Sequence, residues 1–298
     1  MRDMAWIAVD WGTSHLRAWL MLADGSIIER RQSEDGMGVL APEGFEPALQ
    51  ALCGDVLPAP VIACGMVGSR QGWAEAPYTA VPCKPPGADA ATLAPIRMPC
   101  LSVRILPGVK QANPADVMRG EETQIAGYLS RNPDFAGVIC LPGTHTKWVH
   151  VSAGEIVSFR TAMTGEMFSL LSRQSVLRHS VGNGWDEQAF ALGVDQAISR
   201  PEGLAAALFS LRAEGLLDGL PPASARARLS GLLIGAELAA MRPYWLGQQV
   251  ALIGAQDLSD AYAVALAAQA VPVLSANAEE MTLAGLSAAY HELCGETA

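Results

Sequence analysis

The sequence predicts an α/β protein with two similar domains, because one arrangement of short strands occurs twice along the chain. Each copy reads as an apolar strand, a tight Gly-Thr turn, a second strand, a glycine turn and a third strand, over residues 5–31 and 137–161. A further glycine, Gly36 or Gly165, lies eleven residues past the glycine turn in each copy. Apolar strands bounded by turn residues and joined to long helical stretches are typical of an α/β fold.

The composition favours a folded, acidic protein. Half of the 298 residues are hydrophobic and 17% are charged, which excludes disorder as the main state. The formal net charge of −10 makes nucleic acid a poor partner. It does not exclude a nucleotide, because phosphates can be bound by local backbone N–H groups.

Cysteine usage and hydropathy indicate the compartment. The six cysteines include no C-x-x-C pair, so we expect buried thiols in a reducing environment rather than a zinc site or disulfides. No long apolar run precedes Asp10, and the stretch 261–274 is too short and interrupted to span a bilayer. We therefore expect a cytoplasmic protein without a membrane partner. The oligomeric state stays open, a homo-oligomer included.

Local signals place the remaining elements of the first domain. Asn113 followed by Pro114 predicts a helix start, and this helix is expected to run to about residue 130. The Pro, Gly and Ala content of residues 76–99 predicts an irregular stretch. Two more apolar strands are expected, at 61–64 and 101–106.

The second domain is expected to be mostly helical after its meander. Ser259 is a candidate cap for an Ala-rich helix, and Asn277 with Glu280 forms a capping box for the last helix, 278–293. The domains are expected at 1–134, completed by 278–298, and at 135–277. The other expected elements are helices at 187–199, 203–217 and 224–241 and strands at 250–254 and 271–275.

The first Gly-Thr turn offers a metal and phosphate site. Asp10 ends an apolar strand, where a carboxylate needs a partner, and Mg²⁺ is a natural one. Gly12 allows close approach of a phosphate, and Thr13 and Ser14 add hydroxyl donors. An Asx-turn between two strands would explain the same residues.

The second turn repeats this geometry with different chemistry. Gly143 and Thr144 match the first turn, whereas Leu141 stands at the place of Asp10. His145 and Lys147 add a polar group and a cation that could neutralise charge on a transferred phosphate. Lys147 could also be an ordinary exposed strand residue. The repetition itself favours a pair of turns that hold phosphates from two sides.

A pair of glutamates and a loop with one arginine are candidates for contacts with a second substrate, the one that would accept a phosphate. Glu121 and Glu122 lie on or beside the apolar face of the expected helix, and either could act as general base. Spacing does not separate them, and a surface Glu pair would read the same. Arg70 in the glycine-rich loop after residue 64 suits a substrate carboxylate, with Ser69 beside it. Arg17 and Arg160 are weaker alternatives.

These motifs resemble a known superfamily. The two Gly-Thr turns, the strand ending at Gly254 and the helices at 114–130 and 278–293 are similar to the phosphate motifs, adenosine motif and connecting helices of actin-like ATPases. The resemblance implies two RNase H-like domains around an interdomain cleft. It also implies that the turn from Gly254 to Gln256 lies under the adenine of ATP.

More closely, the chain resembles the 2-dehydro-3-deoxygalactonokinase family. The strings that carry this resemblance are VDWGT at 9–13, CGMVGSRQGW at 64–73, MRGEETQ at 118–124, LPGTHTKW at 141–148 and MTGEMF at 163–168. It implies phosphorylation of the 6-hydroxyl of 2-dehydro-3-deoxy-D-galactonate, a sugar acid, by ATP and Mg²⁺. The configuration at C4 of the substrate is not fixed by the sequence.

Two other functions stay open. The Gly-Glu-Glu string is also similar to that of exopolyphosphatases, so a phosphohydrolase of the same fold is one alternative. The other is a nonenzymatic ATP-dependent binding protein. Dependence of turnover on a sugar acid separates the kinase from both.

Overall fold

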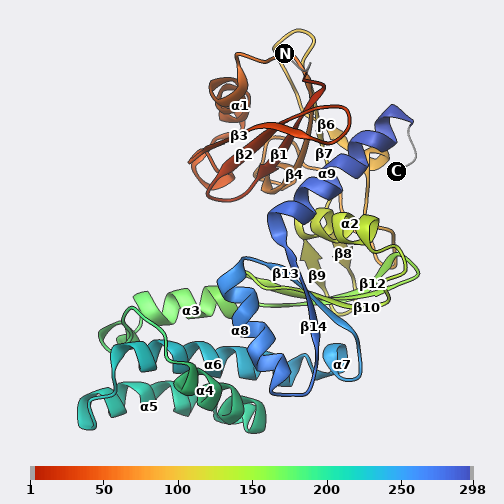
Figure 1. The fold of residues 1–298 in the computed structure, drawn as a ribbon. Helices are drawn as coiled ribbons and strands as arrows, with labels where there is room; N and C mark the ends of the chain where they lie inside the picture. Colours follow the sequence, from red (N-terminus) through yellow and green to blue (C-terminus); the bar gives the residue numbers. More distant parts are fainter. Residues whose placement is uncertain (1–3, 296–298) are drawn as a thin grey trace. The chain divides into compact units, whose positions relative to one another are not determined.

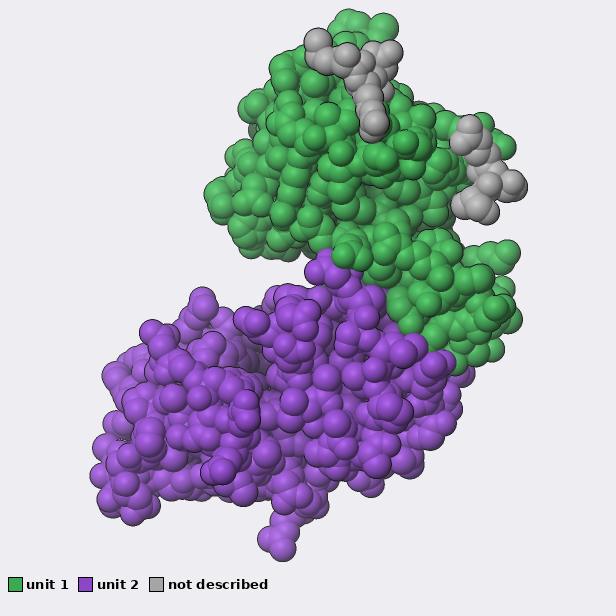
Figure 2. All heavy atoms as spheres, in the orientation of Figure 1, with its two compact units in different colours: residues 1–136, 151–158, 278–298 green, residues 137–150, 159–277 purple. Residues whose placement is uncertain are grey.

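The computed structural model describes residues 4–295 and divides the chain into two compact units. Unit 1 consists of residues 1–136, 151–158 and 278–298, and unit 2 of residues 137–150 and 159–277 (Figure 2). Across 4–295, no helix combines the length and apolar character needed to cross a membrane.

Unit 1 is built on a six-stranded sheet of order β3-β2-β1-β4-β7-β6. The first three strands form the expected antiparallel meander, and β1, β4 and β7 run parallel. The strands are β1 (Trp6–Trp11), β2 (Leu16–Met21), β3 (Ile27–Ser33), β4 (Pro60–Gly65), β6 (Thr92–Leu93) and β7 (Ser102–Ile105).

Alternate side chains of β1 are buried on opposite faces of this sheet. Ile7 and Val9 pack in a cluster with Phe45 of α1 (Phe45–Cys53), a helix that the sequence patterns did not predict. Trp6 belongs to a second cluster with Leu286 of α9 (Ala278–Cys294). Burial on both faces explains why β1 reads as continuously apolar.

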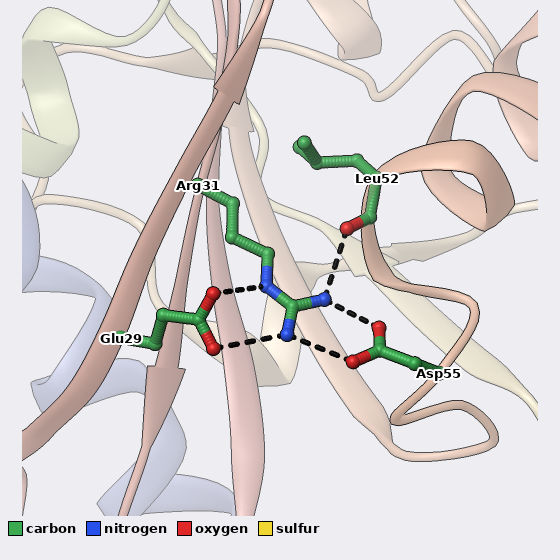
Figure 3. Close-up of polar contacts among 4 residues, drawn as sticks. All are labelled: Glu29, Arg31, Leu52 and Asp55. Atoms are coloured by element: carbon green, nitrogen blue, oxygen red, sulfur yellow. Dashed lines mark hydrogen bonds and ion pairs between the residues drawn. The ribbon is translucent and has the colours of Figure 1, made fainter.

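An ion-pair network ties β3 to the end of α1. The Arg31 guanidinium donates hydrogen bonds to the carboxylates of Glu29 and Asp55 and to the carbonyl oxygen of Leu52 (Figure 3). These bonds hold the pKa of both carboxyl groups below its usual range. The network therefore stabilises the outer edge of the meander.

The helix expected from Asn113 onward begins later than predicted. The chain first pairs β8 (Val109–Gln111) with β9 (Asp116–Met118), and α2 spans Glu121–Arg131. Strand β8 also pairs with β5 (Thr79–Ala80) in a three-stranded sheet. The prediction was wrong because an Asn-Pro pair also suits a hairpin turn, and backbone pairing of β8 with β9 overrides the local helix signal.

Two glycines allow α2 and α9 to pack closely, as Figure 1 shows for this helix pair. A Cβ atom on Gly127 would lie 1.9 Å from the carbonyl oxygen of Met281. A Cβ atom on Gly285 would lie 2.0 Å from the carbonyl oxygen of Thr123. Glycine at these two positions therefore allows a backbone contact between the helices that a side chain would prevent.

Unit 2 contains a five-stranded sheet of order β12-β11-β10-β13-β14. Strands β10, β13 and β14 run parallel. The strands are β10 (Gly137–Leu141), β11 (Thr146–Ser152), β12 (Glu155–Ala162), β13 (Val250–Gly254) and β14 (Val273–Asn277). The helices are α3 (Thr164–Arg173), α4 (Glu187–Ser199), α5 (Leu204–Leu217), α6 (Pro222–Ala240), α7 (Arg242–Trp245) and α8 (Gln256–Ala267).

Two predictions from the sequence were wrong: the helix cap at Ser259 and the burial of all six cysteines. Ser259 does not cap α8, because the chain enters the helix directly after Gly254 and Ser259 lies buried inside it. Cys100 and Cys294 are exposed and Cys83 is half-buried, since they lie outside the strands and helix faces that bury Cys53, Cys64 and Cys140.

Candidate functional site

Asp10 pairs with Arg17 across the first two strands. The two residues face each other in the register of β1 and β2, and Arg17 Nη1 lies 3.1 Å from Asp10 Oδ2. Burial raises the pKa of Asp10, Arg17 opposes that shift, and the charges of Glu279 and Glu121 add to it. The Asp10 side chain is still 24% exposed, so one carboxylate with a cationic neighbour is open to a ligand.

The turn from Gly12 to Ser14 carries two exposed hydroxyl side chains, those of Thr13 and Ser14. Its backbone is held by hydrogen bonds from the N–H of Met37 to the Gly12 carbonyl and from the N–H of Gly38 to the Thr13 carbonyl. A Cβ atom on Gly36 would lie 2.3 Å from the Thr13 carbonyl oxygen. The recurrent glycine of the first repeat therefore supports this turn from behind.

Glu121 and Glu122, the first residues of α2, differ sharply in environment. Glu122 is fully buried, and both its carboxylate oxygens accept from the Gly120 N–H at 2.8 Å. Burial and the neighbouring Glu121 charge raise the pKa of Glu122 to about 8. Glu121 is half-buried, and its Oε2 accepts from the Arg119 N–H at 2.9 Å.

Two glycines bring this helix start close to Asp10. A Cβ atom on Gly120 would lie 3.4 Å from the Cα of Gly65, at the end of β4. A Cβ atom on Gly65 would in turn lie 3.4 Å from Asp10 Oδ1. The structure therefore brings Asp10, Glu121 and Glu122 together within unit 1.

The loop after β4 presents one of its two predicted substrate residues to solvent. Arg70 is exposed, whereas Ser69 is buried and its hydroxyl has no hydrogen-bond partner among residues 4–295. Arg119, which the sequence patterns did not single out, supports this loop. Its guanidinium packs on the Tyr78 ring at 4.3 Å and would meet a Cβ atom on Gly68 at 2.8 Å.

The second Gly-Thr turn forms one end of a cavity of about 690 Å³ in unit 2. Gly143 and Thr144 line it together with Thr164 and Gly165 at the start of α3. A Cβ atom on Gly165 would lie 2.3 Å from the Gly143 carbonyl oxygen, so the second recurrent glycine also supports its turn. The remaining lining residues are Phe168, Trp185, Arg226, Ser230, Leu233, Ile234, Asp257, Leu258, Asp260, Ala261 and Tyr262.

His145 and Lys147 of this turn each contact a neighbouring group. His145 Nε2 lies 2.6 Å from Glu166 Oε2, and both side chains are partly exposed. Lys147 is only 4% exposed, and its Nζ donates to the His145 carbonyl oxygen at 3.2 Å. Lys147 is thus folded back beneath the turn and supports its backbone.

Helix α8, rather than the turn before it, contributes to the cavity wall. Asp257 and Asp260 line the cavity, whereas Gly254 is a buried strand residue and the Gln256 side-chain N–H₂ donates to Asp260 at 2.7 Å. Trp185 lines the same cavity with 48% of its surface exposed, and its ring lies 5.1 Å from that of Phe190. The sequence offered one signal for Trp185, its place in a glycine-rich loop.

The chain matches a family of kinases over almost its whole length. A model of the 2-keto-3-deoxy-galactonokinase family matches residues 10–289. This chain belongs to that family. The resemblance inferred from the sequence strings is therefore confirmed.

Individual relatives agree with this assignment. The chain is 40% identical to the probable 2-dehydro-3-deoxygalactonokinase of Rhizobium meliloti (strain 1021), with 95% of each chain covered. It is 36% identical to the 2-dehydro-3-deoxygalactonokinase of Escherichia coli (strain K12), with 96% and 97% covered.

Solved structures confirm the fold class. A crystal structure of a Sinorhizobium meliloti protein assigned as a 2-dehydro-3-deoxygalactonokinase has a TM-score of 0.91, 38% identity and 97% and 99% coverage. Component A of the (R)-2-hydroxyglutaryl-CoA dehydratase of Acidaminococcus fermentans has a TM-score of 0.56 at 13% identity, over 98% of this chain and 100% of that one. The second likeness concerns the fold alone. The predicted α/β fold of two actin-like units is confirmed.

Proposed function

We propose that this protein is a sugar-acid kinase that transfers the γ-phosphate of ATP to the 6-hydroxyl of 2-dehydro-3-deoxy-D-galactonate. The observation that carries the proposal is the family match across residues 10–289. The cavity of unit 2 and the carboxylates of unit 1 supply the kinds of group that this reaction needs. Kinase catalysis depends on positioning and on charge stabilisation rather than on covalent chemistry by the protein.

The unit 2 cavity suits a nucleotide in one orientation. Its volume of about 690 Å³ is in the range of small-molecule sites. The start of α3 and the Gly143–Thr144 backbone favour anionic phosphates, because a helix N-terminus carries partial positive charge. The carboxylates of Asp257 and Asp260 repel phosphates and can accept hydrogen bonds from ribose hydroxyls. We therefore place the phosphates at the turn and the nucleoside toward α8.

The carboxylate of Asp10 fits a magnesium ion that is shared with substrate phosphates. Among the described residues, no three His, Cys, Asp or Glu side chains gather into a metal-binding cluster. A single carboxylate is nevertheless typical for Mg²⁺, which completes its shell with phosphate oxygens and water. When bound, the ion offsets negative charge on the phosphates. Asp10 would hold it directly or through water, and Asp10→Ala is expected to abolish turnover without unfolding the protein.

Glu121 is the better candidate for the general base. Glu122 has a pKa of about 8 and uses both oxygens on Gly120, so it is mostly protonated and occupied at neutral pH. In the proposed step the 6-hydroxyl oxygen attacks the γ-phosphorus and the bond to the β–γ bridging oxygen breaks. The hydroxyl proton passes to the Glu121 carboxylate, and ADP leaves with the bridging oxygen.

Arg70 is the better candidate for the carboxylate of the acceptor. Arg17 is already paired with Asp10, whereas the Arg70 side chain is exposed at the loop that carries Ser69. A guanidinium can bind a carboxylate through two parallel hydrogen bonds. Arg70→Lys is therefore expected to raise KM for the sugar acid more than it lowers kcat.

An ADP-release assay with and without sugar acid tests the proposal. A kinase produces ADP only when 2-dehydro-3-deoxy-D-galactonate is present, and comparison with its C4 epimer measures the stereochemical preference. ADP formation that does not depend on the sugar acid would instead indicate a phosphohydrolase. Nucleotide binding without any ADP formation would indicate a binding protein.

A further inference from the structure

A buried carboxylate in unit 2 lies behind the nucleotide cavity and contacts several of its walls. Glu237 of α6 is 5% exposed, and no motif in the sequence points to it. Its Oε1 accepts from the Trp148 Nε1–H at 2.7 Å. Its Oε2 accepts from the hydroxyls of Thr164 and Tyr262, the latter at 2.9 Å.

The network extends to the strand that follows the phosphate turn. Thr146 Oγ1 and the Tyr262 hydroxyl are 3.0 Å apart. The single proton of Tyr262 is directed to Glu237, so Thr146 is the donor in this pair. Thr146, Trp148, Thr164 and Tyr262 are each at most 5% exposed, which makes the cluster a closed polar network in an apolar interior.

Two of the three partners of Glu237 belong to the cavity wall. Thr164 and Tyr262 line the cavity directly. Thr164 precedes Gly165, which lies against Gly143, and the Glu166 N–H donates to the Thr144 carbonyl oxygen at 2.9 Å. Glu237 thus holds the phosphate turn from two sides, through α3 and through Tyr262 and Thr146.

We propose that Glu237 is a positioning residue for the nucleotide, which fixes Thr164 and Tyr262 so that the 143–144 turn is preformed for phosphates. The inference rests on the proposed nucleotide site. A carboxylate with three donors is suited to this task, because it accepts from all of them at once. Burial raises the pKa of Glu237 while the three donors lower it. A glutamine at this position keeps the volume but has only one acceptor oxygen.

The test measures the Kd of Mg-ADP by titration calorimetry for the full-length wild type and matched variants. Glu237→Gln and Thr164→Val are each expected to raise Kd about tenfold or more, because a misplaced turn loses preorganised donors. Thr164→Ser keeps the hydroxyl and is expected to restore affinity close to that of the wild type. Glu46→Gln is the control: Glu46 is a buried carboxylate of unit 1 that accepts from the N–H groups of Arg97 and Met98.

The outcomes separate this inference from the proposed function. Glu46→Gln is expected to lower the unfolding midpoint and leave Kd unchanged, as a purely structural role would. A folded Glu237→Gln variant that binds Mg-ADP like the wild type would overturn the inference. If Glu237→Gln does not fold, unchanged Kd in both Thr164→Val and Tyr262→Phe would overturn it. A wild type that does not bind Mg-ADP would overturn the nucleotide site, and this inference with it.

Discussion

Gly165 lies against the carbonyl oxygen of Gly143, where a Cβ atom would approach to 2.3 Å. Gly36 lies against the first turn in a similar way, where a Cβ atom would approach the carbonyl oxygen of Thr13 to 2.3 Å. The contact atoms are backbone, which cannot rotate away as a flexible side chain could. Glycine recurs at this position of the repeat because a side chain there would clash with the turn in both units.

This relationship predicts different effects for two alanine substitutions in unit 2. Gly165→Ala is expected to displace the turn and weaken Mg-ADP binding about tenfold or more. A Cβ atom on Gly143 meets nothing within 4 Å, so Gly143→Ala is expected to keep the unfolding midpoint and weaken binding only by crowding the phosphates. Calorimetry and thermal unfolding of both variants check this. Wild-type affinity in Gly165→Ala would contradict it.

The contact between α2 and α9 predicts a loss of stability on adding one methyl group. Gly127→Ala would gain about 1 kcal/mol in helix propensity, but overpacking of backbone typically costs about 1–3 kcal/mol or more. We expect a net decrease in the free energy of unfolding, measured by urea denaturation. Gly215→Ala in α5 is the control, because its nearest contact is the Ser180 hydroxyl at 3.3 Å. Equal stability of the two variants would argue against close helix packing.

Burial of Glu122 predicts a specific dependence of stability on pH. Its pKa rises from 4.5 to about 8 on folding, so the folded state binds the proton more tightly than the unfolded state. Its contribution to stability is complete below pH 4.5 and is lost as the pH rises toward 8, by at most about 1.4 kcal/mol per pH unit.

Glu122→Gln removes this titration and serves as its test. Relative to the wild type, the variant is expected to gain stability steadily between pH 5 and pH 8, as measured by urea unfolding at each pH. Parallel profiles for the two proteins would show that Glu122 binds no extra proton in the folded state in this range.

The different environments of the two glutamates predict different kinetic effects. Glu121→Gln is expected to lower kcat by about 10²–10⁴. Glu122→Gln keeps an oxygen that can accept from Gly120 and is expected to retain most of the activity at neutral pH. Steady-state kinetics at saturating ATP and sugar acid check this. Equal, mild losses would mean that neither residue is the base.

The exposed position of Trp185 in the cavity predicts a change in tryptophan fluorescence when a nucleotide binds. The other six tryptophans are at most 6% exposed, whereas Trp185 is 48% exposed and lines the cavity. Base stacking on an exposed indole is expected to quench its red-shifted emission on titration with Mg-ADP. The signal should disappear in Trp185→Phe. A wild-type spectrum that stays unchanged at saturating Mg-ADP would place the base elsewhere.

The meanders and the parallel strands could be predicted because their signals are local. Apolar runs and the turn glycines that bound them are contained within a few residues, as for Trp6–Trp11 and Val250–Gly254. The helix start at Asn113 was wrong for a complementary reason. Pairing of residues 109–111 with 116–118 depends on contacts between the two strands, so neither strand's own sequence predicts it.

The site residues also divide into those that short motifs indicate and those that only the fold brings together. Asp10, Gly143 and Glu121 could be proposed from motifs that lie on short segments. Glu237 could not, because its partners Thr164 and Tyr262 come together only in the folded unit. The glycine-rich loop around Trp185 does not by itself indicate a site, since Trp185 joins the cavity only through helices distant in sequence. A single glutamate in an Ala- and Leu-rich helix carries no local mark of a buried network.

The central claim is phosphate transfer to the 6-hydroxyl of the sugar acid. The most direct measurement is the phosphorus–proton correlation NMR spectrum of the product formed from ATP, Mg²⁺ and 2-dehydro-3-deoxy-D-galactonate. We predict that every phosphomonoester signal of the product is coupled to the two C6 protons, and that the product forms in equal amount with ADP. Release of inorganic phosphate, or a phosphate coupled to any other position, would contradict the claim.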